Sequence, residues 1–362
     1  MNPVTEKESR LFTILRDDLG KVDFPRTFHD EFEELKQVML TDERRASLAG
    51  MRAPKRKIVF LWWLLRSLVR KFTPFRRLLF VLAIVLLLFR FQRGNEEINF
   101  SGMGILILIL LIMLELKDKL VAHEELNAGR AVQQSLMPER MPAVPGWNVW
   151  LFTRSANEVG GDLIDFVPLD DNRYGVALGD VAGKGLSAAL LSAQLQATLK
   201  AMVSDYPQFE ALGAKLNRIY CRDCMPERFA SLNYVEFTPG SGGVRMLNAG
   251  HMPAVLVRAD SRIETIPKGG PALGILREAA YAEQRAALES GDSLIVYSDG
   301  LTEARNEAGD FYGEERLLAS LRSMNRMPVD QWGERIVAGV DAFLGPARPN
   351  DDLSIIILRR GG

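Results

Sequence analysis

Aspartates at the ends of expected strands are the residues of this chain best suited to chemistry. Three segments place one beside glycine: EVGGDLIDF with Asp162, GVALGDVAGKG with Asp180, and LIVYSDGLTEA with Asp299. A fourth acidic pair, Asp351 and Asp352, opens NDDLSIIIL. Several aspartates that converge at a sheet edge repel one another unless cations neutralise them. Because all-oxygen ligands suit magnesium or manganese, the pattern predicts a divalent-metal site.

Each of these aspartates alone has a simpler explanation, because Asp and Gly dominate turns. Four such sites in this order and with apolar flanks are harder to explain by turns. The other candidate catalytic side chains, histidine and cysteine, form no recognisable site. The histidines His29, His123 and His251 are few and widely separated, and neither Cys221 nor Cys224 begins a Cys-x5-Arg loop. The sequence therefore favours a divalent-metal site over a site built on histidine or cysteine.

Short strands must position these aspartates. After Pro142 and Pro145 the chain contains NVWLF, YGVALGD, RFASLNYVEF, GGVRMLN, AVLVR and DSLIVYSDG, with two longer helical stretches between them. Many strands without a regular strand and helix alternation indicate an α+β sandwich rather than a doubly wound sheet.

An ordered set of motifs carries a resemblance to a known family. The set comprises LNAGRAVQQSLMPERMP, EVGGDLIDF, GDVAGKGLSAAL, LNAGHMPAVLV, GGPALGI, SDGLTEARN and NDDLSIIIL, from about Glu124 to Arg360. It resembles the bacterial SpoIIE/RsbU-type branch of the metal-dependent protein phosphatases, the protein phosphatase 2C-like (PPM) superfamily. The resemblance implies a four-layer αββα sandwich with two central antiparallel sheets. It also implies two Mn²⁺ or Mg²⁺ ions at one edge.

The same resemblance implies roles for the first two acidic motifs. Asp180 would bridge both metals, and the backbone carbonyl of Val181 would be a further ligand. Asp162 would bind a metal or hydrogen-bond metal-bound water. Asp162 and Asp180 are therefore the expected catalytic residues around a metal-activated water.

The second metal would be completed by the last two acidic motifs. Asp299 and Asp351 are the expected ligands, and Asp352 would lie beside them or ligate in place of Asp351. Two metals lower the pKa of a shared water and neutralise phosphoryl oxygens. The implied reaction is hydrolysis of phosphoserine or phosphothreonine on a protein. The implied substrate is an anti-sigma factor antagonist in a partner-switching signalling pathway.

Three other motif residues have different expected roles. Lys184 either touches the substrate phosphate or is a solvated lysine at a helix start. His251, in NAGHMPA, is expected to be structural at a tight turn. The bridging loop continues with Ala182, whereas the larger superfamily often has histidine there. Water or another side chain must then protonate the leaving group.

Two rival interpretations are weaker. GDVAGKG resembles a phosphate-binding loop, but Gly179 and Gly183 are one residue too close for GxxxxGK[ST], and Gly185 follows the lysine. A catalytically weak phosphatase fold could instead serve as a membrane sensor or scaffold. Such a fold is expected to have lost acidic ligands, and this chain retains them.

The N-terminal third contains three apolar runs, which begin at Ile58, Leu78 and Phe100. We expect residues 76–116 to form a two-pass membrane hairpin, because flanking arginines extend short apolar helices. The run at 58–69, interrupted by Arg66, is expected to be interfacial. Basic residues on both sides place both ends inside, with the phosphatase domain in the cytoplasm at the inner membrane.

Four regions are expected along the chain. They are a helical or flexible cytoplasmic region 1–57, an apolar membrane region 58–116, a linker helix 117–141 and a SpoIIE-type phosphatase domain 142–362. The linker is either a solvated helix or a regulatory helix that pairs in a homodimer and transmits a signal into the phosphatase domain. Phosphorylated protein and membrane are the expected partners.

Composition argues against nucleic acid as a partner. The chain has 45 Lys and Arg against 46 Asp and Glu, a formal net charge of -1, so no overall basic field favours DNA. Two cysteines, in CRDC, cannot build a disulfide framework and lack a second ligand pair for zinc. Reduced thiols are expected.

Overall fold

The computed structural model describes residues 47–48, 51, 53–93, 96–169, 172–224, 227–324 and 327–361. The chain divides into two compact units, Met1–Lys119 and Leu120–Gly362. The expected cytoplasmic region 1–57 lies largely outside the described residues.

The first unit is built around helices. It contains α4 (Ala53–Lys71), α5 (Pro74–Leu88), the two-stranded ribbon of β1 (Arg90–Arg93) and β2 (Glu96–Asn99), and the start of α6 (Ser101–Ser135). Thr73 caps α5, and Pro74 opens the helix where its missing N–H costs nothing. Gly104 of α6 contacts α5 so closely that an added Cβ would lie 2.8 Å from the Ala83 carbonyl oxygen. The Arg76 guanidinium of α5 joins the same two helices, because it lies 3.0 Å from the Glu115 carboxylate and 2.7 Å from the Asp118 carboxylate of α6.

Within the described part of the chain, none of the helices combines the length and the apolar character needed to cross a bilayer. α5 has 15 residues, fewer than the roughly 20 that a span requires. The apolar part of α6 runs directly into Glu115, Lys117 and Asp118 of the same helix. The expected two-pass hairpin at 76–116 is therefore not supported. The interfacial role expected for 58–69, which falls in α4, stays a prediction.

The second unit contains two five-stranded antiparallel sheets. The first has the order β10-β7-β6-β5-β4, and the second has the order β3-β12-β11-β8-β9. Their bounds are β3 Trp147–Arg154, β4 Asp162–Pro168, β5 Tyr174–Val181, β6 Ala230–Phe237, β7 Gly243–Ala249, β8 Ala254–Val257, β9 Ile263–Ile266, β10 Glu283–Ala287, β11 Ser293–Tyr297 and β12 Leu353–Arg360.

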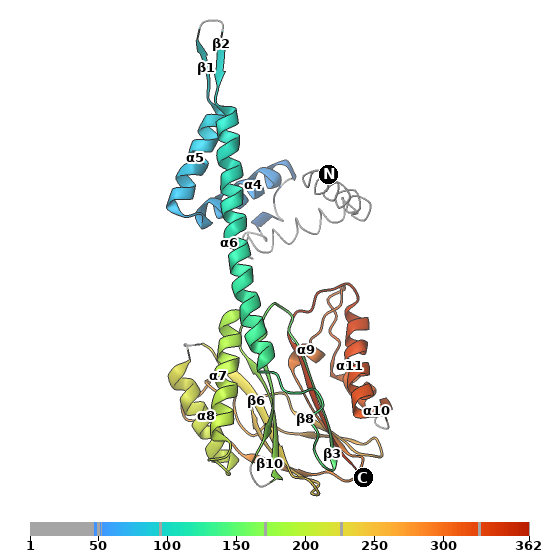
Figure 1. Cartoon of the computed structure of the whole chain (residues 1–362). Coiled ribbons are helices and arrows are strands. Elements are labelled where there is room, and N and C mark those ends of the chain that lie inside the picture. Colours follow the sequence, from blue (N-terminus) through green and yellow to red (C-terminus); the bar gives the residue numbers. More distant parts are fainter. Residues whose placement is uncertain are drawn as a thin grey trace, which may run out of the picture. The chain divides into compact units, whose positions relative to one another are not determined.

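Three apolar cores define the layers of this unit. The sheets pack on each other through side chains such as Leu178, Val235 and Ile356. Helices α7 (Leu186–Met202) and α8 (Phe209–Asp223) cover the first sheet. Helices α10 (Glu314–Met324) and α11 (Val329–Leu344) cover the second sheet on the other side (Figure 1). The predicted α+β sandwich with two antiparallel sheets is confirmed, and its layers follow the order αββα.

The apolar alternation of the strands explains this arrangement. In β5 and β12 nearly every residue is buried, because one face meets the opposite sheet and the other meets a helix layer. The charged residues of these two strands consequently lie at the strand ends. The aspartates of the sequence motifs lie at these ends.

Candidate functional site

The first sheet brings two aspartates together across neighbouring strands. Asp162 opens β4, Asp180 lies one residue before the end of β5, and the antiparallel register makes the two residues direct partners. Asp162 is 4% exposed, and one of its carboxylate oxygens accepts a hydrogen bond from the Ser354 hydroxyl of the second sheet. An added Cβ on Gly161 would lie 3.1 Å from the Val181 carbonyl oxygen. The turn before β4 therefore lies against the end of β5.

The second sheet contributes the remaining aspartates. Asp299 follows β11 and opens the short helix α9 (Asp299–Thr302), whereas Asp351 and Asp352 immediately precede β12. β11 and β12 are hydrogen-bonded neighbours, with Tyr297 opposite Ile355. Antiparallel pairing places the end of one strand beside the start of the other. These three aspartates consequently gather at one end of the second sheet.

The Asp352 carboxylate accepts three hydrogen bonds from the backbone of the turn before β4. One carboxylate oxygen accepts the N–H of Ala156 at 2.7 Å, and the other accepts the N–H groups of Gly161 at 2.6 Å and Asp162 at 3.3 Å. Asp352 is 6% exposed. By contrast, the Asp351 side chain is 44% exposed and lies 3.6 Å from the Lys184 ammonium. The adjacent carboxylates therefore have different surroundings.

The acidic residues of the two sheets lie close enough for their charges to act on one another. Burial is the main reason that the pKa of Asp180 rises to about 7, and the charges of Asp299, Asp351 and Asp352 raise it in the same direction. Burial, followed by the charges of Asp180 and Asp352, raises the pKa of Asp162. Burial and the Asp351 charge do the same for Asp299. Five carboxylates thus share one electrostatic environment.

This set of donors has the chemistry of a hard-cation site. Among the residues that the structure describes, no group of three or more His, Cys, Asp or Glu side chains is already arranged to hold a metal ion. The carboxylates nevertheless repel one another, and a divalent cation would relieve that repulsion. All the donors are oxygens, so the residues fit Mg²⁺ or Mn²⁺ better than zinc.

The loop after Asp180 is held by an arginine that sequence reasoning missed. Arg228 donates from Nη1 to the Ala182 carbonyl oxygen at 2.6 Å. Gly183 has φ +116°, and an added Cβ would lie 1.5 Å from the same Nη1, so only glycine fits. Arg228 lies at the start of the β6 segment, and nothing in the local sequence distinguishes it from a solvated arginine.

Lys184 and His251 occupy different settings. The Lys184 ammonium donates to the Asn350 carbonyl oxygen and lies beside Asp351, so the structure does bring it to the acidic residues. His251 is 2% exposed, with Nδ1 2.7 Å from the Ser231 hydroxyl, and burial lowers its pKa to about 4. A neutral, enclosed imidazole at this turn agrees with a structural role.

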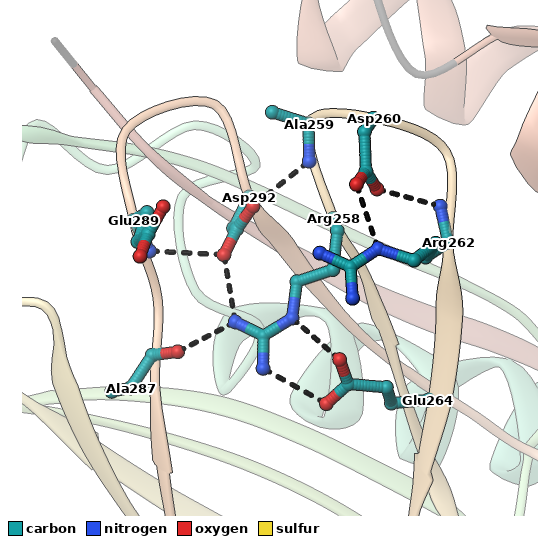
Figure 2. A pocket seen from close by; sticks show the side chains of 8 residues that line it. All are labelled: Arg258, Ala259, Asp260, Arg262, Glu264, Ala287, Glu289 and Asp292. Carbon is teal, nitrogen blue, oxygen red and sulfur yellow. Dashed lines mark hydrogen bonds and ion pairs between the residues drawn. The ribbon is translucent and has the colours of Figure 1, made fainter.

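A separate surface cavity lies beside the hairpin of β8 and β9. It has a volume of about 450 Å³, and its lining includes Arg258, Glu264 and Asp292. In Figure 2 the Arg258 guanidinium lies between the two carboxylates, at 2.8 Å from Glu264 and 2.9 Å from Asp292. These ion pairs satisfy the arginine, and the cavity contains none of the predicted site residues.

Comparison with known proteins identifies the class. The chain resembles the SiaA-PP2C domain of Pseudomonas aeruginosa, with a TM-score of 0.57 and 18% identity over 67% of this chain and 98% of that one. At this identity the similarity shows the fold alone, which is that of the PP2C phosphatases.

The sequence comparisons identify the family. The family model "Stage II sporulation protein E (SpoIIE)" matches residues 170–361. The chain is 25% identical over 238 residues to Protein IcfG of Synechocystis sp. and 25% identical over 244 residues to phosphoserine phosphatase RsbU of Bacillus subtilis. The matches cover 58% and 65% of this chain, and 37% and 70% of the two relatives. The chain therefore belongs to the SpoIIE family, the SpoIIE/RsbU-type branch of the PPM phosphatases.

Proposed function

We propose that this chain is a metal-dependent protein serine/threonine phosphatase that hydrolyses phosphoserine or phosphothreonine on a protein. The carrying observation is the convergence of five carboxylates from both sheets. Burial is the main cause that raises the pKa of Asp180 to about 7, and the charges of Asp299, Asp351 and Asp352 add to it. Membership of the SpoIIE family and similarity to a phosphoserine phosphatase support the same reaction.

Asp162, Asp180, Asp299 and Asp351, with the Val181 carbonyl, would hold two Mn²⁺ or Mg²⁺ ions. When bound, such ions lower the pKa of water and neutralise phosphoryl oxygens. Asp162 and Asp180 are the ligands that the first sheet would supply, and the β4–β5 register holds them side by side.

We assign Asp351 rather than Asp352 as the ligand in the last motif. Three backbone N–H groups already occupy the Asp352 carboxylate, so turning it toward a cation would leave buried donors unpaired. Asp352 instead fixes the turn that positions Asp162.

Lys184 would help to bind the substrate phosphate. Its ammonium beside Asp351 offers a positive charge to an incoming phosphate. Since His251 is buried and neutral, water would protonate the leaving oxygen.

The proposed substrate is a phosphorylated anti-sigma factor antagonist in a partner-switching pathway. Support comes from similarity to RsbU, which is itself named a phosphoserine phosphatase. The alternative is a catalytically weak sensor or scaffold, and a measurement of metal-dependent hydrolysis distinguishes it from a phosphatase.

The test is Mn²⁺-dependent hydrolysis of a phosphoserine peptide by the full chain. Replacing Asp180 with asparagine should lower the rate by on the order of 100-fold, because a proposed metal ligand would lose its charge. The exposed Asp205→Asn serves as a matched control and should retain activity. A wild-type chain that folds but shows no metal-dependent hydrolysis would favour the scaffold.

We also propose that the first unit attaches the chain to the inner membrane, with the phosphatase domain in the cytoplasm. Exposed apolar side chains on α5 and α6, including Leu78, Leu88 and Ile112, support this attachment. From Arg44 to Asn95 the sequence contains no acidic residue, and basic residues recur throughout. Such a segment suits an anionic lipid surface.

Finally, we propose that two copies pair through the linker helix. Leu120, Val121 and Val132 of α6 are exposed apolar residues that support this contact.

A further inference from the structure

The loop between β9 and β10 exposes two large apolar side chains next to each other. Ile275 is 54% exposed and Leu276 is 52% exposed. Phe229, which directly precedes β6, is 43% exposed. We call these three residues the apolar patch. Single exposed apolar residues are ordinary on a protein surface, whereas a group of them marks an interaction site.

The apolar patch lies beside the loop that follows β5. Ala230 pairs with Val181 on one side and with Leu273 on the other. Ala230 and Leu273 exchange two backbone hydrogen bonds, at 2.9 and 2.8 Å. Phe229 accepts the N–H of Ala182 through its carbonyl oxygen at 2.9 Å. Because neighbouring strands are about 4.8 Å apart, Leu273 lies about 10 Å from Val181, whose carbonyl is a proposed metal ligand.

A buried asparagine fixes the loop that carries Ile275 and Leu276. Asn217 of α8 is 1% exposed, and its Oδ1 accepts the Gly274 N–H at 2.9 Å. Its Nδ2 donates to the carbonyl oxygens of Leu276 at 2.8 Å and Arg277 at 3.3 Å. Gly274 has φ +93°, which favours glycine. The backbone beneath the two apolar side chains is thus ordered in advance, so a ligand that covers them loses little affinity to ordering the loop.

We propose that the apolar patch binds an apolar residue of the phosphoprotein substrate, about three or four positions from the phosphoserine. The inference rests on the proposed function and adds a determinant of substrate choice. An extended peptide advances about 3.3 Å per residue, so three to four residues cover the roughly 10 Å from Val181 to the Leu273 segment. A substrate with its phosphoserine at the acidic residues therefore places such a side chain over the patch.

The test compares two phosphoserine peptides as substrates of the full chain with Mn²⁺. One peptide has leucine at the third and fourth positions on both sides of the phosphoserine, and the other has serine there. Wild type should hydrolyse the leucine peptide with a kcat/KM on the order of 10-fold higher, because partial burial of an apolar side chain stabilises a complex by about that factor. The difference should lie mainly in KM.

The double variant Ile275→Ser with Leu276→Ser should lose this preference. Both side chains are exposed, so replacing them should leave the fold intact. p-Nitrophenyl phosphate is too small to contact the patch, and it serves as the reference substrate. The ratio of kcat/KM for the leucine peptide to kcat/KM for p-nitrophenyl phosphate should fall on the order of 10-fold in the double variant.

Met141→Ser is the matched control. Met141 is also an exposed apolar residue of the second unit, at 47%, and its neighbour Arg140 is hydrogen-bonded to Leu151 within β3. It belongs to the other sheet and lies outside the apolar patch. This variant should keep both the leucine preference and the substrate ratio of wild type.

Peptide binding supplies a readout that needs no hydrolysis. In fluorescence anisotropy with the Asp180→Asn chain, the labelled leucine peptide should bind on the order of 10-fold more tightly than the serine peptide. Adding the two serine replacements should remove the difference. If wild type hydrolyses neither peptide while this binding difference appears, the proposed function fails and the patch still binds apolar peptide.

Other results would overturn the proposal. Equal kcat/KM of wild type for the two peptides would do so, as would a leucine preference that the double variant retains. If that variant keeps the preference and loses binding to phosphatidylglycerol vesicles, the patch is a lipid surface instead. If it keeps the preference and sediments with a lower mass than wild type, the patch pairs two copies of the chain.

Discussion

Asp180 is the residue whose ionisation most directly reports on the site. Burial of its carboxylate and the charges of three neighbouring carboxylates together raise its pKa to about 7. An aspartate in the unfolded chain titrates near 3.9. In the metal-free fold Asp180 therefore keeps its proton to a higher pH than in the unfolded chain, and its ionisation adds to the charge repulsion in the site.

This difference predicts how stability depends on pH without metal. A folded pKa above the unfolded value contributes stability that is present below the unfolded pKa and lost as pH rises through the folded one. The metal-free chain should consequently melt at a lower temperature near pH 8 than near about pH 5.5. Differential scanning fluorimetry in chelator measures this change.

The variant Asp180→Asn supplies the control for the pH experiment. It removes one titrating carboxylate, so its melting temperature should fall less over the same range. Mn²⁺ at pH 8 should restore wild type more than the variant, because the cation offsets the same repulsion. A wild-type decrease equal to that of the variant would contradict the assignment.

At the scale of elements, the turn before β4 depends on a residue 190 positions away. Asp352, just before β12, accepts the N–H groups of Ala156, Gly161 and Asp162. The two sheets are thereby joined at the edge where the aspartates meet. A carboxylate with this role is structural even though it sits beside a proposed ligand.

Replacing Asp351 and Asp352 one at a time should separate a structural role from metal binding. Asp352→Ala leaves buried N–H groups unpaired and should lower the free energy of unfolding by about 1–3 kcal/mol. Asp351→Ala should change stability little and should mainly raise the Mn²⁺ requirement. Urea unfolding and metal titration of both variants make the comparison. The reverse result would show that Asp352, not Asp351, is the ligand.

At the scale of the whole molecule, the two units differ in their surfaces. The described helices of the first unit expose many large apolar side chains, whereas the second unit contains three buried apolar cores.

Membrane attachment predicts that the full chain co-sediments with vesicles containing phosphatidylglycerol and less with phosphatidylcholine alone. The replacement Trp62→Glu on exposed α4 should weaken this binding, because it places a negative charge on an apolar position. Leu190→Glu, at an exposed apolar position of α7, is the matched control. Equal sedimentation of wild type and Trp62→Glu would contradict a role for α4.

The sequence by itself determined the family, the class of fold and the order of the acidic motifs. Strand-like alternation and aspartates at strand ends are local patterns, and the structure confirms the α+β sandwich that they predict. Hydropathy did not predict the structure of residues 76–116. An apolar run does not reveal that α5 ends at Leu88 and is followed by strand β1.

Only the tertiary structure decided which side chains support the aspartates. Arg228 on the Ala182 carbonyl and Asp352 on the turn before β4 are contacts between segments far apart in the chain. Each depends on strand register and side-chain reach, which no local spacing encodes. The physical reason is that a hydrogen bond is fixed within a few tenths of an ångström, and only the packed sheets set distances that closely.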